Sequence, residues 1–340
     1  MKKKVFLLFL VMCVGVAFIS LGVVNSEAAI KLTYSNFFPP THIQSKLAES
    51  WSKEVEKRTS GRIQIEYYAG QTLTKARQCY DGVVTGLSDL GFSVLAYTRG
   101  RFPVMAAVDL PLGYVSGKAA TKVVNAVYNR FKPKELMDTQ VMYLHAHGPG
   151  LLHTSGKPVR KIEDIRGLKI RSHGTSAKVV KALGGTPVPK PMPETYQMLQ
   201  KGVVDGAVYP FEANKGWKLG EVTDYATAAF SAAYSTSFFV VMNKDKWKLI
   251  PADDQRIIEG INREWAEKHG QAWDESDMAG IQFILSLGND ILGIDKDEAA
   301  RWKKAVAPII DDFVKGMKKK GFSNAQEIVD FTVETLNKYQ

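Results

Sequence analysis

The first hundred residues alternate between two patterns of apolar positions. Apolar and polar residues alternate as in a strand at 30–34 and 63–67, and residues 89–92 read as a short buried strand. The intervening segments 41–57 and 73–84 repeat apolar residues at helical spacing. Strands that alternate with helices over such short links predict a parallel sheet covered by helices.

A second unit of the same kind follows, offset by about 116 residues. It contains two predicted strands and two predicted helices, at 168–171, 186–188, 176–183 and 193–201. Both units place a glycine at a helix end, Gly86 in the first and Gly202 in the second, three residues before an aspartate that opens a strand. Two α/β units of the same build predict two lobes with a cleft between them.

The last third of the chain becomes helical after a buried strand at 238–242. Residues 251–287 contain no internal proline, and a continuous helix of that length would extend about 55 Å. Three glycines are expected bend points in it: Gly260, Gly270 and Gly280. Further helices are predicted at 295–319 and 324–339.

The N-terminus has the pattern of a secretory signal. Three lysines precede an uncharged apolar run at 5–24, and small residues follow up to Ala28. Cleavage near Ala28 is the favoured interpretation, although the run is long enough for a retained membrane anchor. Loss of residues 1–28 would remove three lysines and one glutamate and so lower the net charge from +10 to +8. We therefore expect an exported, periplasmic protein.

Composition excludes several classes of protein. With 45% hydrophobic and 24% charged residues in 340, the chain is typical of a globular protein. Two cysteines, Cys13 and Cys79, are too few for a disulfide scaffold, and Cys79 is interpreted as a buried thiol. The cluster of lysines at 315–320 ends a predicted helix, where cations are favourable, so nucleic acid is not an expected partner.

Motifs of the common enzyme classes are missing from the sequence. It contains no Gly-x-Ser-x-Gly, His-Glu-x-x-His or nucleotide-binding glycine motif. His145 and His147 would share one face of a strand, as metal ligands do, but no third ligand stands at a fixed spacing. The favoured alternative is that these histidines face solvent or line a pocket. We expect no metal and no cofactor.

Arg171 is the one basic side chain that the pattern places at a binding position. It ends the apolar strand at 168–171, on the edge where α/β sheets place their ligands. An arginine there either pairs with an acidic side chain of the protein or binds the two oxygens of a ligand carboxylate. The pattern alone leaves both interpretations open.

Four motifs give the chain a resemblance to a known family. They are EVEKRTSGRI at 54–63, DIRGLKIR at 164–171, YQMLQKGVVDG at 196–206 and MNKDKW at 242–247. In this order and spacing the sequence resembles the DctP-type solute-binding proteins of TRAP (tripartite ATP-independent periplasmic) transporters. The resemblance covers essentially the whole chain after residue 28.

The resemblance implies a two-lobed α/β periplasmic binding protein of type II-like fold. Hinge strands would join the lobes, and a long bent helix would cross both. Lobe I is expected at 29–148 plus about 236–275, and lobe II at 149–235 plus about 276–340. The lobes would close on an organic acid and deliver it to the small and large membrane subunits of a TRAP permease. The family arginine that clamps the ligand carboxylate corresponds to Arg171.

Departures from the family pattern narrow the expected ligand. Sialic-acid-binding relatives carry a second arginine where this chain has Leu151, and an asparagine where it has Tyr209. Two positions after the strand at 89–92 that are polar in those relatives are Val94 and Tyr97 in this chain. Apolar walls cannot satisfy sugar hydroxyls or a second carboxylate, because each unmade hydrogen bond costs about 1–3 kcal/mol. The departures therefore predict a monocarboxylate with an aromatic or branched apolar body, such as an aromatic 2-oxo acid or an amino-acid derivative.

The remaining ligand-binding candidates fall into three groups. The apolar candidates are Val94, Leu151 and Met192. The aromatic candidates, of which about half are expected to touch ligand, are Phe37, Phe38, Tyr97, Tyr209, Phe211, Trp217 and Tyr234. The polar candidates are Asn36, His147, Glu212 and Asn214. If the ligand is a C4-dicarboxylate instead, its second cation must come from elsewhere, with Lys75 or Arg99 as candidates.

Two alternative functions are compatible with the same predicted cleft. A secreted enzyme acting on an organic acid would need a nucleophile or an acid/base pair, which no motif supplies. A binding module that serves a membrane receptor instead of a permease would have the same sequence features.

Overall fold

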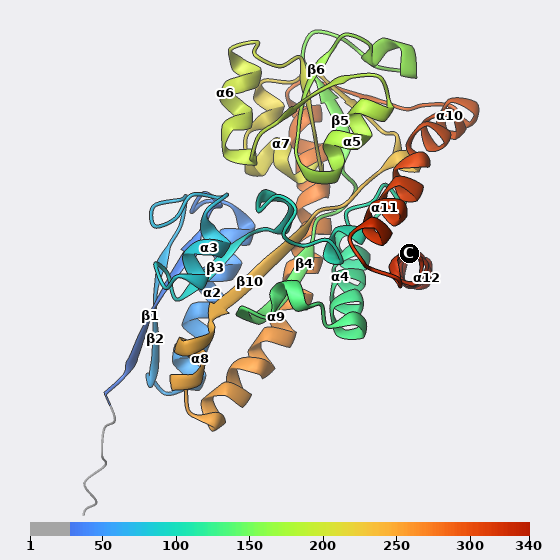
Figure 1. The fold of residues 1–340 in the computed structure, drawn as a ribbon. Coiled ribbons are helices and arrows are strands. Elements are labelled where there is room, and N and C mark those ends of the chain that lie inside the picture. The colour runs from blue at the N-terminus through green and yellow to red at the C-terminus, as the bar shows by residue number, and fades with distance from the viewer. Residues whose placement is uncertain (1–27) are drawn as a thin grey trace, which may run out of the picture.

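A computed structural model describes residues 28–340 as two α/β lobes, one below the other in Figure 1. The expected two-lobed periplasmic-binding-protein fold is confirmed. Residues 1–27 of the predicted signal peptide or anchor, with Cys13, lie outside the described residues. Within residues 28–340, no helix combines the length and the apolar character needed to cross a bilayer.

The first lobe is built on a five-stranded sheet. Its strands are β1 (Ile30–Asn36), β2 (Ile63–Tyr68), β3 (Leu90–Val94), β4 (Thr139–Ala146) and β10 (Ser237–Asn243). They lie in the order β2-β1-β3-β10-β4, with β1 parallel to β2 and β3, and β10 antiparallel to β3 and β4. The helices that contact these strands are α2 (Ile43–Arg58), α3 (Cys79–Val84), α4 (Gly117–Phe131), α8 (Lys244–Leu249) and the long helix α9 (Ala252–Ser286).

The second lobe contains a six-stranded sheet. Its strands are β5 (Leu151–Thr154), β6 (Lys169–Ser172), β7 (Thr186–Pro189), β8 (Gly206–Tyr209), β9 (Tyr225–Thr227) and β11 (Asp290–Leu292). They lie in the order β11-β9-β5-β8-β6-β7. Around this sheet lie α5 (Gly174–Ala182), α6 (Thr195–Gln200), α7 (Glu212–Gly216), α10 (Lys296–Val306) and α11 (Pro308–Lys319).

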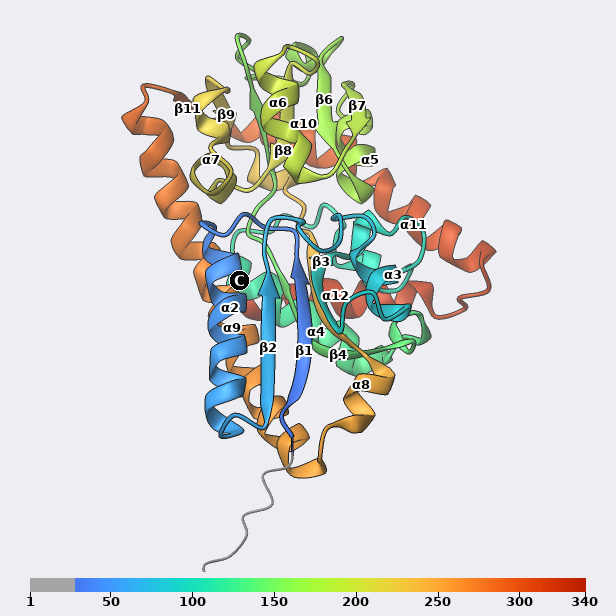
Figure 2. The ribbon, with the colours of Figure 1, turned by 90° about the vertical axis from the view of Figure 1, so that its left-hand side faces the viewer.

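Two extended segments and one helix run between the lobes. The segment 147–150 links β4 to β5, the segment 233–236 leads into β10, and the two meet in an antiparallel bridge between Gly150 and Tyr234. Helix α9 (Ala252–Ser286) contacts α2 and α4 of the first lobe and α7 of the second. Figure 2 shows α9 extending along one side of the molecule from the lower lobe to the upper one.

Two of the three glycines expected to bend α9 are places where another chain segment comes close. A Cβ atom on Gly280 would lie 2.0 Å from the carbonyl oxygen of Phe211, and one on Gly270 would lie 3.0 Å from Cβ of Thr121. Gly260 has nothing nearer to such an atom than an arginine nitrogen at 4.0 Å. Helix α9 runs unbroken through all three positions, so two of these glycines allow close packing against both lobes.

The predicted helices at 295–319 and 73–84 differ from the structure. The first prediction was wrong at Pro308, where α10 and α11 separate, because proline lacks the N–H and its ring collides with the preceding turn. In the second segment only α3 is helical, from Cys79 onward. Before it, the Thr74 N–H donates to the hydroxyl of Ser35 at 3.2 Å, so this donor is used outside a helix.

The last helix returns to the first lobe. Helix α12 (Ala325–Tyr339) packs against α4, while α10 and α11 lie beside α5 of the second lobe. Beyond α12, the Gln340 side chain accepts a hydrogen bond from the Val115 N–H at 3.0 Å, which fixes the end of the chain. The expected lobe boundaries stay a prediction. The contacts of α12 with α4 group it with the first lobe, apart from residues 276–319.

Asp109 makes the stability of this fold depend on pH. It is buried at the start of β10, where it accepts hydrogen bonds from the N–H and hydroxyl of Ser237, both at 2.9 Å. Burial raises the pKa of Asp109 to about 7. The folded state therefore binds a proton that the unfolded state has released, and this group lowers stability as pH rises from about 4 to about 7.

We expect Asp109→Asn to gain stability relative to the wild type as pH rises through that window. The gain should reach a few kcal/mol at pH 8 and should be small at pH 4, by linkage between the two pKa values. Urea unfolding at several pH values measures it, with the exposed Asp312→Asn as the control substitution. A stability difference that stays constant from pH 4 to pH 8 would contradict the prediction.

Candidate functional site

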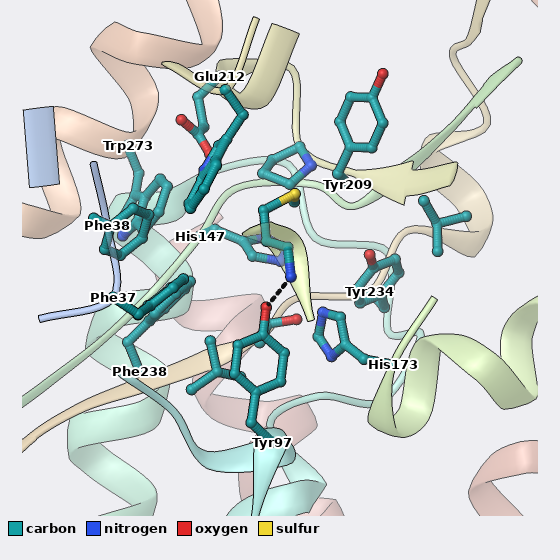
Figure 3. Close-up of a pocket in the computed structure, with 16 residues that line it drawn as sticks. Phe37, Phe38, Tyr97, His147, His173, Tyr209, Glu212, Tyr234, Phe238 and Trp273 are labelled. Atoms are coloured by element: carbon teal, nitrogen blue, oxygen red, sulfur yellow. Dashed lines mark hydrogen bonds between the residues drawn. The ribbon is translucent and has the colours of Figure 1, made fainter. Parts of the chain in front are cut away.

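A small pocket with a cavity volume of about 20 Å³, partly open to solvent, lies where the two lobes and the crossing segments meet (Figure 3). A cavity of that size holds about one water molecule, so the side chains that line it must move apart to admit an organic acid. Its lining is mainly aromatic, with two imidazoles and one carboxyl group. The lining residues are Phe37, Phe38, Val94, Tyr97, His147, His173, Met192, Val208, Tyr209, Pro210, Glu212, Trp217, Tyr234, Thr236, Phe238 and Trp273.

The first lobe supplies aromatic rings from the ends of its parallel strands. Phe37 and Phe38 directly follow β1, and Tyr97 follows β3, at the edge where α/β sheets bind ligands. The rings of Phe37 and Phe38 lie 4.2 Å apart, and Tyr97 packs edge-on against Phe37 at 5.8 Å. Trp217 of the second lobe stacks on Phe37 at 6.0 Å. The rings thus form a continuous apolar wall between the lobes.

Polar contacts also connect the lobes across the pocket. The Met192 N–H donates to the Tyr97 hydroxyl at 2.9 Å, the bond drawn in Figure 3. Nε2 of His42 lies 2.9 Å from Oε2 of Glu212. With Trp217 stacked on the first lobe as well, the structure represents a closed arrangement of the lobes.

Arg171 lies on β6 and is fully buried. Its Nε–H donates to the carbonyl oxygen of Lys190 at 2.9 Å. Its Nη1 and Nη2 atoms have no hydrogen-bond partner within residues 28–340, so no acidic side chain there neutralises it. Of the two interpretations of this residue, an internal ion pair is absent from the described part of the chain. Buried guanidinium N–H groups without acceptors are a strong indication of an anion site.

Arg171 does not itself line the pocket, but its charge acts on side chains that do. Burial, and then the nearby charge of Arg171, lower the pKa of His173 well below its usual value. Burial lowers the pKa of His147 to about 4, and Arg171 contributes to the lowering. Both imidazoles are therefore neutral at pH 7, and Arg171 supplies the positive charge at this end of the pocket.

Ten of the predicted binding residues line the pocket. They are Phe37, Phe38, Val94, Tyr97, His147, Met192, Tyr209, Glu212, Trp217 and Tyr234. Six of the seven predicted aromatic side chains are among them, and which of these touch ligand stays a prediction. Tyr209 presents its ring, because its hydroxyl donates to Oδ1 of Asn214 at 3.2 Å.

Four other candidates are placed outside the pocket lining. Leu151 and Phe211 are buried together in a small apolar cluster with Ile284. Asn36 uses its amide within the first lobe, donating to the Tyr67 hydroxyl at 2.7 Å and accepting from the Phe38 N–H at 3.0 Å. Asn214 accepts from Tyr209, as described above. Leu151, Phe211 and Asn36 are thus committed to packing within the lobes, whereas the buried Nδ2 of Asn214 has no hydrogen-bond partner among the described residues.

Six lining residues were missed, and some had a readable signal. They are His173, Val208, Pro210, Thr236, Phe238 and Trp273. His173 follows Arg171 by two positions, and Thr236 and Phe238 follow Tyr234 by two and four, which is the spacing of one strand face. Trp273 has no local signal, because it reaches the pocket only through the path of α9.

The two cations considered for a dicarboxylate lie elsewhere. Lys75 and Arg99 are both exposed, and neither lines the pocket. Within the described chain, the lining includes no lysine or arginine at all. A second carboxylate of a ligand would therefore find no cation in this pocket to pair with.

The cysteine and the histidine pair considered for other chemistry are packed within the fold. Cys79 is buried, and burial raises the pKa of its thiol to about 12, as expected of an unreactive cysteine. His145 accepts from the Trp273 indole N–H at 2.9 Å and stacks on His269 at 4.4 Å. Among residues 28–340, no group of three or more histidine, cysteine, aspartate or glutamate side chains is arranged to hold a metal ion.

Comparison with known proteins gives a consistent result. The profile of the DctP family, described as bacterial extracellular solute-binding protein, family 7, matches residues 34–316. The C4-dicarboxylate-binding periplasmic protein DctP of Rhodobacter capsulatus is 26% identical over 86% of this chain and 89% of its own.

Two solved structures of TRAP solute-binding proteins are also similar. One, from a marine metagenome, is specific for aromatic acid ligands and was solved with metahydroxyphenylacetate. It is 28% identical with a TM-score of 0.87, and the match covers 92% of this chain and 99% of that chain. The other, from Rhodoferax ferrireducens, contains copurified benzoate. It is 29% identical with a TM-score of 0.84, covering 92% of this chain and 98% of that chain.

Proposed function

The chain belongs to the DctP family of bacterial extracellular solute-binding proteins, and we propose that it captures an aromatic monocarboxylate between its two lobes. The family consists of non-enzymatic binding proteins that take up small organic acids. The rival function of a secreted enzyme is therefore set aside.

The unpaired guanidinium of Arg171 is the observation that carries the proposal. Its two terminal nitrogens are buried and have no acceptor among the described residues. A ligand carboxylate would accept from both at once, and charge-assisted bidentate bonds are among the stronger polar contacts in proteins. In a buried site such bonds are weakened little by water or salt.

The apolar wall favours an aromatic body behind that carboxylate. The ring of Phe37 stacks on that of Trp217 at 6.0 Å and on that of Phe238 at 6.5 Å, so these side chains offer ring faces in the pocket. Removal of a phenyl ring from water into such surroundings contributes roughly 25 cal/mol per Å² of apolar area buried. Relatives that carry benzoate or metahydroxyphenylacetate support this ligand class. Aromatic 2-oxo acids such as phenylpyruvate have the same two parts and remain within the proposal.

A C4-dicarboxylate is the second candidate, because a relative of 26% identity is a C4-dicarboxylate-binding protein. Its second carboxylate would lie in a lining with no basic side chain among the described residues. Burial of an unpaired charge costs several kcal/mol. The lining therefore favours the monocarboxylate.

Delivery is proposed to follow the family's route. The ligand-loaded protein in the periplasm would hand its cargo to the small and large membrane subunits of a TRAP permease. A membrane receptor is the alternative recipient. Permease genes beside the gene for this chain would favour transport, and a receptor gene in that place would favour sensing.

We expect aromatic monocarboxylates to raise the melting temperature of the purified protein. Ligand at a hundred times its Kd stabilises by about 2.7 kcal/mol, which corresponds to about 5 °C for a chain of this size. Differential scanning fluorimetry with benzoate, phenylpyruvate and mandelate measures this shift. Succinate and glucuronate are the matched polar acids and should shift the melting temperature by less than about 1 °C. A larger shift with succinate or glucuronate than with any aromatic acid would contradict the proposed ligand class.

A further inference from the structure

Glu212 is the one acidic side chain among the described residues that line the pocket. It begins α7 and is only 3% exposed. Its backbone N–H donates to Oδ1 of Asp277 at 2.7 Å, which fixes the start of α7 against α9. The carboxyl group is therefore held in a defined place in the pocket, on a helix secured by the long crossing helix.

The partner of this carboxyl group does not satisfy it. Nδ1 of His42 accepts from the Gln44 N–H at 3.2 Å, so the proton of the neutral ring belongs on Nε2. That Nε2 lies 2.9 Å from Oε2 of Glu212 but is not aligned to form a hydrogen bond with it. Within residues 28–340, Oε2 has no aligned donor. Buried carboxyl oxygens normally accept hydrogen bonds, and an unmet one is costly.

Glu212 and Arg171 act on different ends of the pocket. Figure 3 shows Glu212 beside Phe38 and Trp273, on the opposite side from Tyr97 and His173. The charge of Arg171 acts on the pKa of five lining residues, Tyr97, His147, His173, Tyr209 and Tyr234, which Figure 3 draws mostly on the side away from Phe38 and Trp273. A ligand whose carboxylate lies near Arg171 would therefore direct its far end toward Glu212.

We propose that Glu212 accepts a hydrogen bond from a hydroxyl group at the end of the ligand remote from its carboxylate. The preferred ligands are then hydroxy-substituted aromatic acids rather than unsubstituted ones. This inference rests on the proposed function, since it assumes that an aromatic carboxylate binds in this pocket. The same carboxyl group acts against a second carboxylate, because two like charges would meet there without a cation.

Paired probes test the inference on the wild-type protein. Isothermal titration calorimetry compares benzoate with 3- and 4-hydroxybenzoate, and each hydroxy acid with its methoxy analogue, which keeps the oxygen but cannot donate. We expect at least one hydroxy acid to bind about tenfold more tightly than both benzoate and its own methoxy analogue, since charge-assisted hydrogen bonds are the stronger ones. Isophthalate, with its second carboxylate, should bind more weakly than benzoate.

Two variants show whether Glu212 is responsible. Glu212→Met removes the acceptor and should abolish the preference, so that benzoate and the hydroxy acid bind this variant with equal affinity. Glu212→Gln keeps a neutral acceptor and should retain part of the preference and bind isophthalate more tightly than the wild type does. The exposed Glu221→Gln is the control and should behave as the wild type. Melting temperatures without ligand establish that each variant is folded.

The outcomes separate this inference from the function on which it rests. Benzoate that binds as well as both hydroxy acids in the wild type would overturn the role of Glu212 and leave the proposed function standing. A hydroxyl preference that survives in a folded Glu212→Met variant would also overturn it. If no aromatic acid binds, the proposed function fails, and the inference fails with it.

Discussion

Replacement of Arg171 with methionine should abolish ligand binding and at the same time raise the stability of the ligand-free protein. Loss of the cation facing a buried carboxylate costs about 2–5 kcal/mol or more, so affinity for benzoate should fall about a thousandfold. The ligand-free protein should gain about 2 kcal/mol, because a buried charge without a partner is replaced by an apolar chain of similar length. The lost bond from Nε to the carbonyl oxygen of Lys190 offsets part of that gain.

Melting curves with and without benzoate measure both effects in one experiment. Arg99→Met and Lys75→Met are the matched controls, since both side chains are exposed cations outside the pocket lining. They should leave benzoate affinity within about twofold of the wild type, as expected of surface substitutions. A structural role for Arg171 predicts the opposite sign, with a lower melting temperature for the ligand-free Arg171→Met protein.

Gly280→Ala should destabilise the protein strongly. The added Cβ would lie 2.0 Å from the carbonyl oxygen of Phe211 and 3.1 Å from Cα of Glu212, and both belong to backbone that cannot rotate away. Overpacking of this kind costs about 3 kcal/mol, which corresponds to a fall of about 6 °C or more in melting temperature. The start of α7 would be pushed off α9, so the ligand pocket should be disturbed as well.

Gly260→Ala provides the comparison within the same helix. Its added Cβ meets nothing closer than 4.0 Å, and alanine favours a helix by about 1 kcal/mol over glycine. This variant should therefore be more stable than the wild type in urea unfolding. Equal effects of the two substitutions would mean that close packing at Gly280 is unimportant.

Local periodicity predicts the α/β units but not every partner in the sheets. The strands β1 and β2 follow from alternation and β3 from a short apolar run, and their parallel pairing follows from the helices between them. Both partners of β10, however, are distant in sequence, β4 by about 100 residues and β3 by about 150, and nothing in these segments encodes either pairing. Long-range pairing of short apolar strands is decided by packing of the whole lobe.

The site residues likewise fall into those that local sequence predicts and those that depend on long-range packing. Arg171 could be located because a strand-end position and a family motif coincide there. Asn36 could not be excluded as a ligand-binding residue from the sequence. Its side-chain amide donates to the hydroxyl of Tyr67 on the neighbouring strand, a partner that only the folded sheet brings close. Trp273 could not be found, since it lies mid-helix in a segment that enters the pocket only after both lobes assemble around it.

The return of α12 to α4 sets a limit on how far the lobes can separate. The linker between α11 and α12 is the five residues 320–324, which span roughly 17 Å when fully stretched. Because α11 lies beside α5 and α12 packs against α4, this linker connects one lobe to the other. The gap between the lobes can therefore widen freely only on the side away from residues 320–324. A shortened linker would restrict the swing of the lobes without touching any residue that lines the pocket.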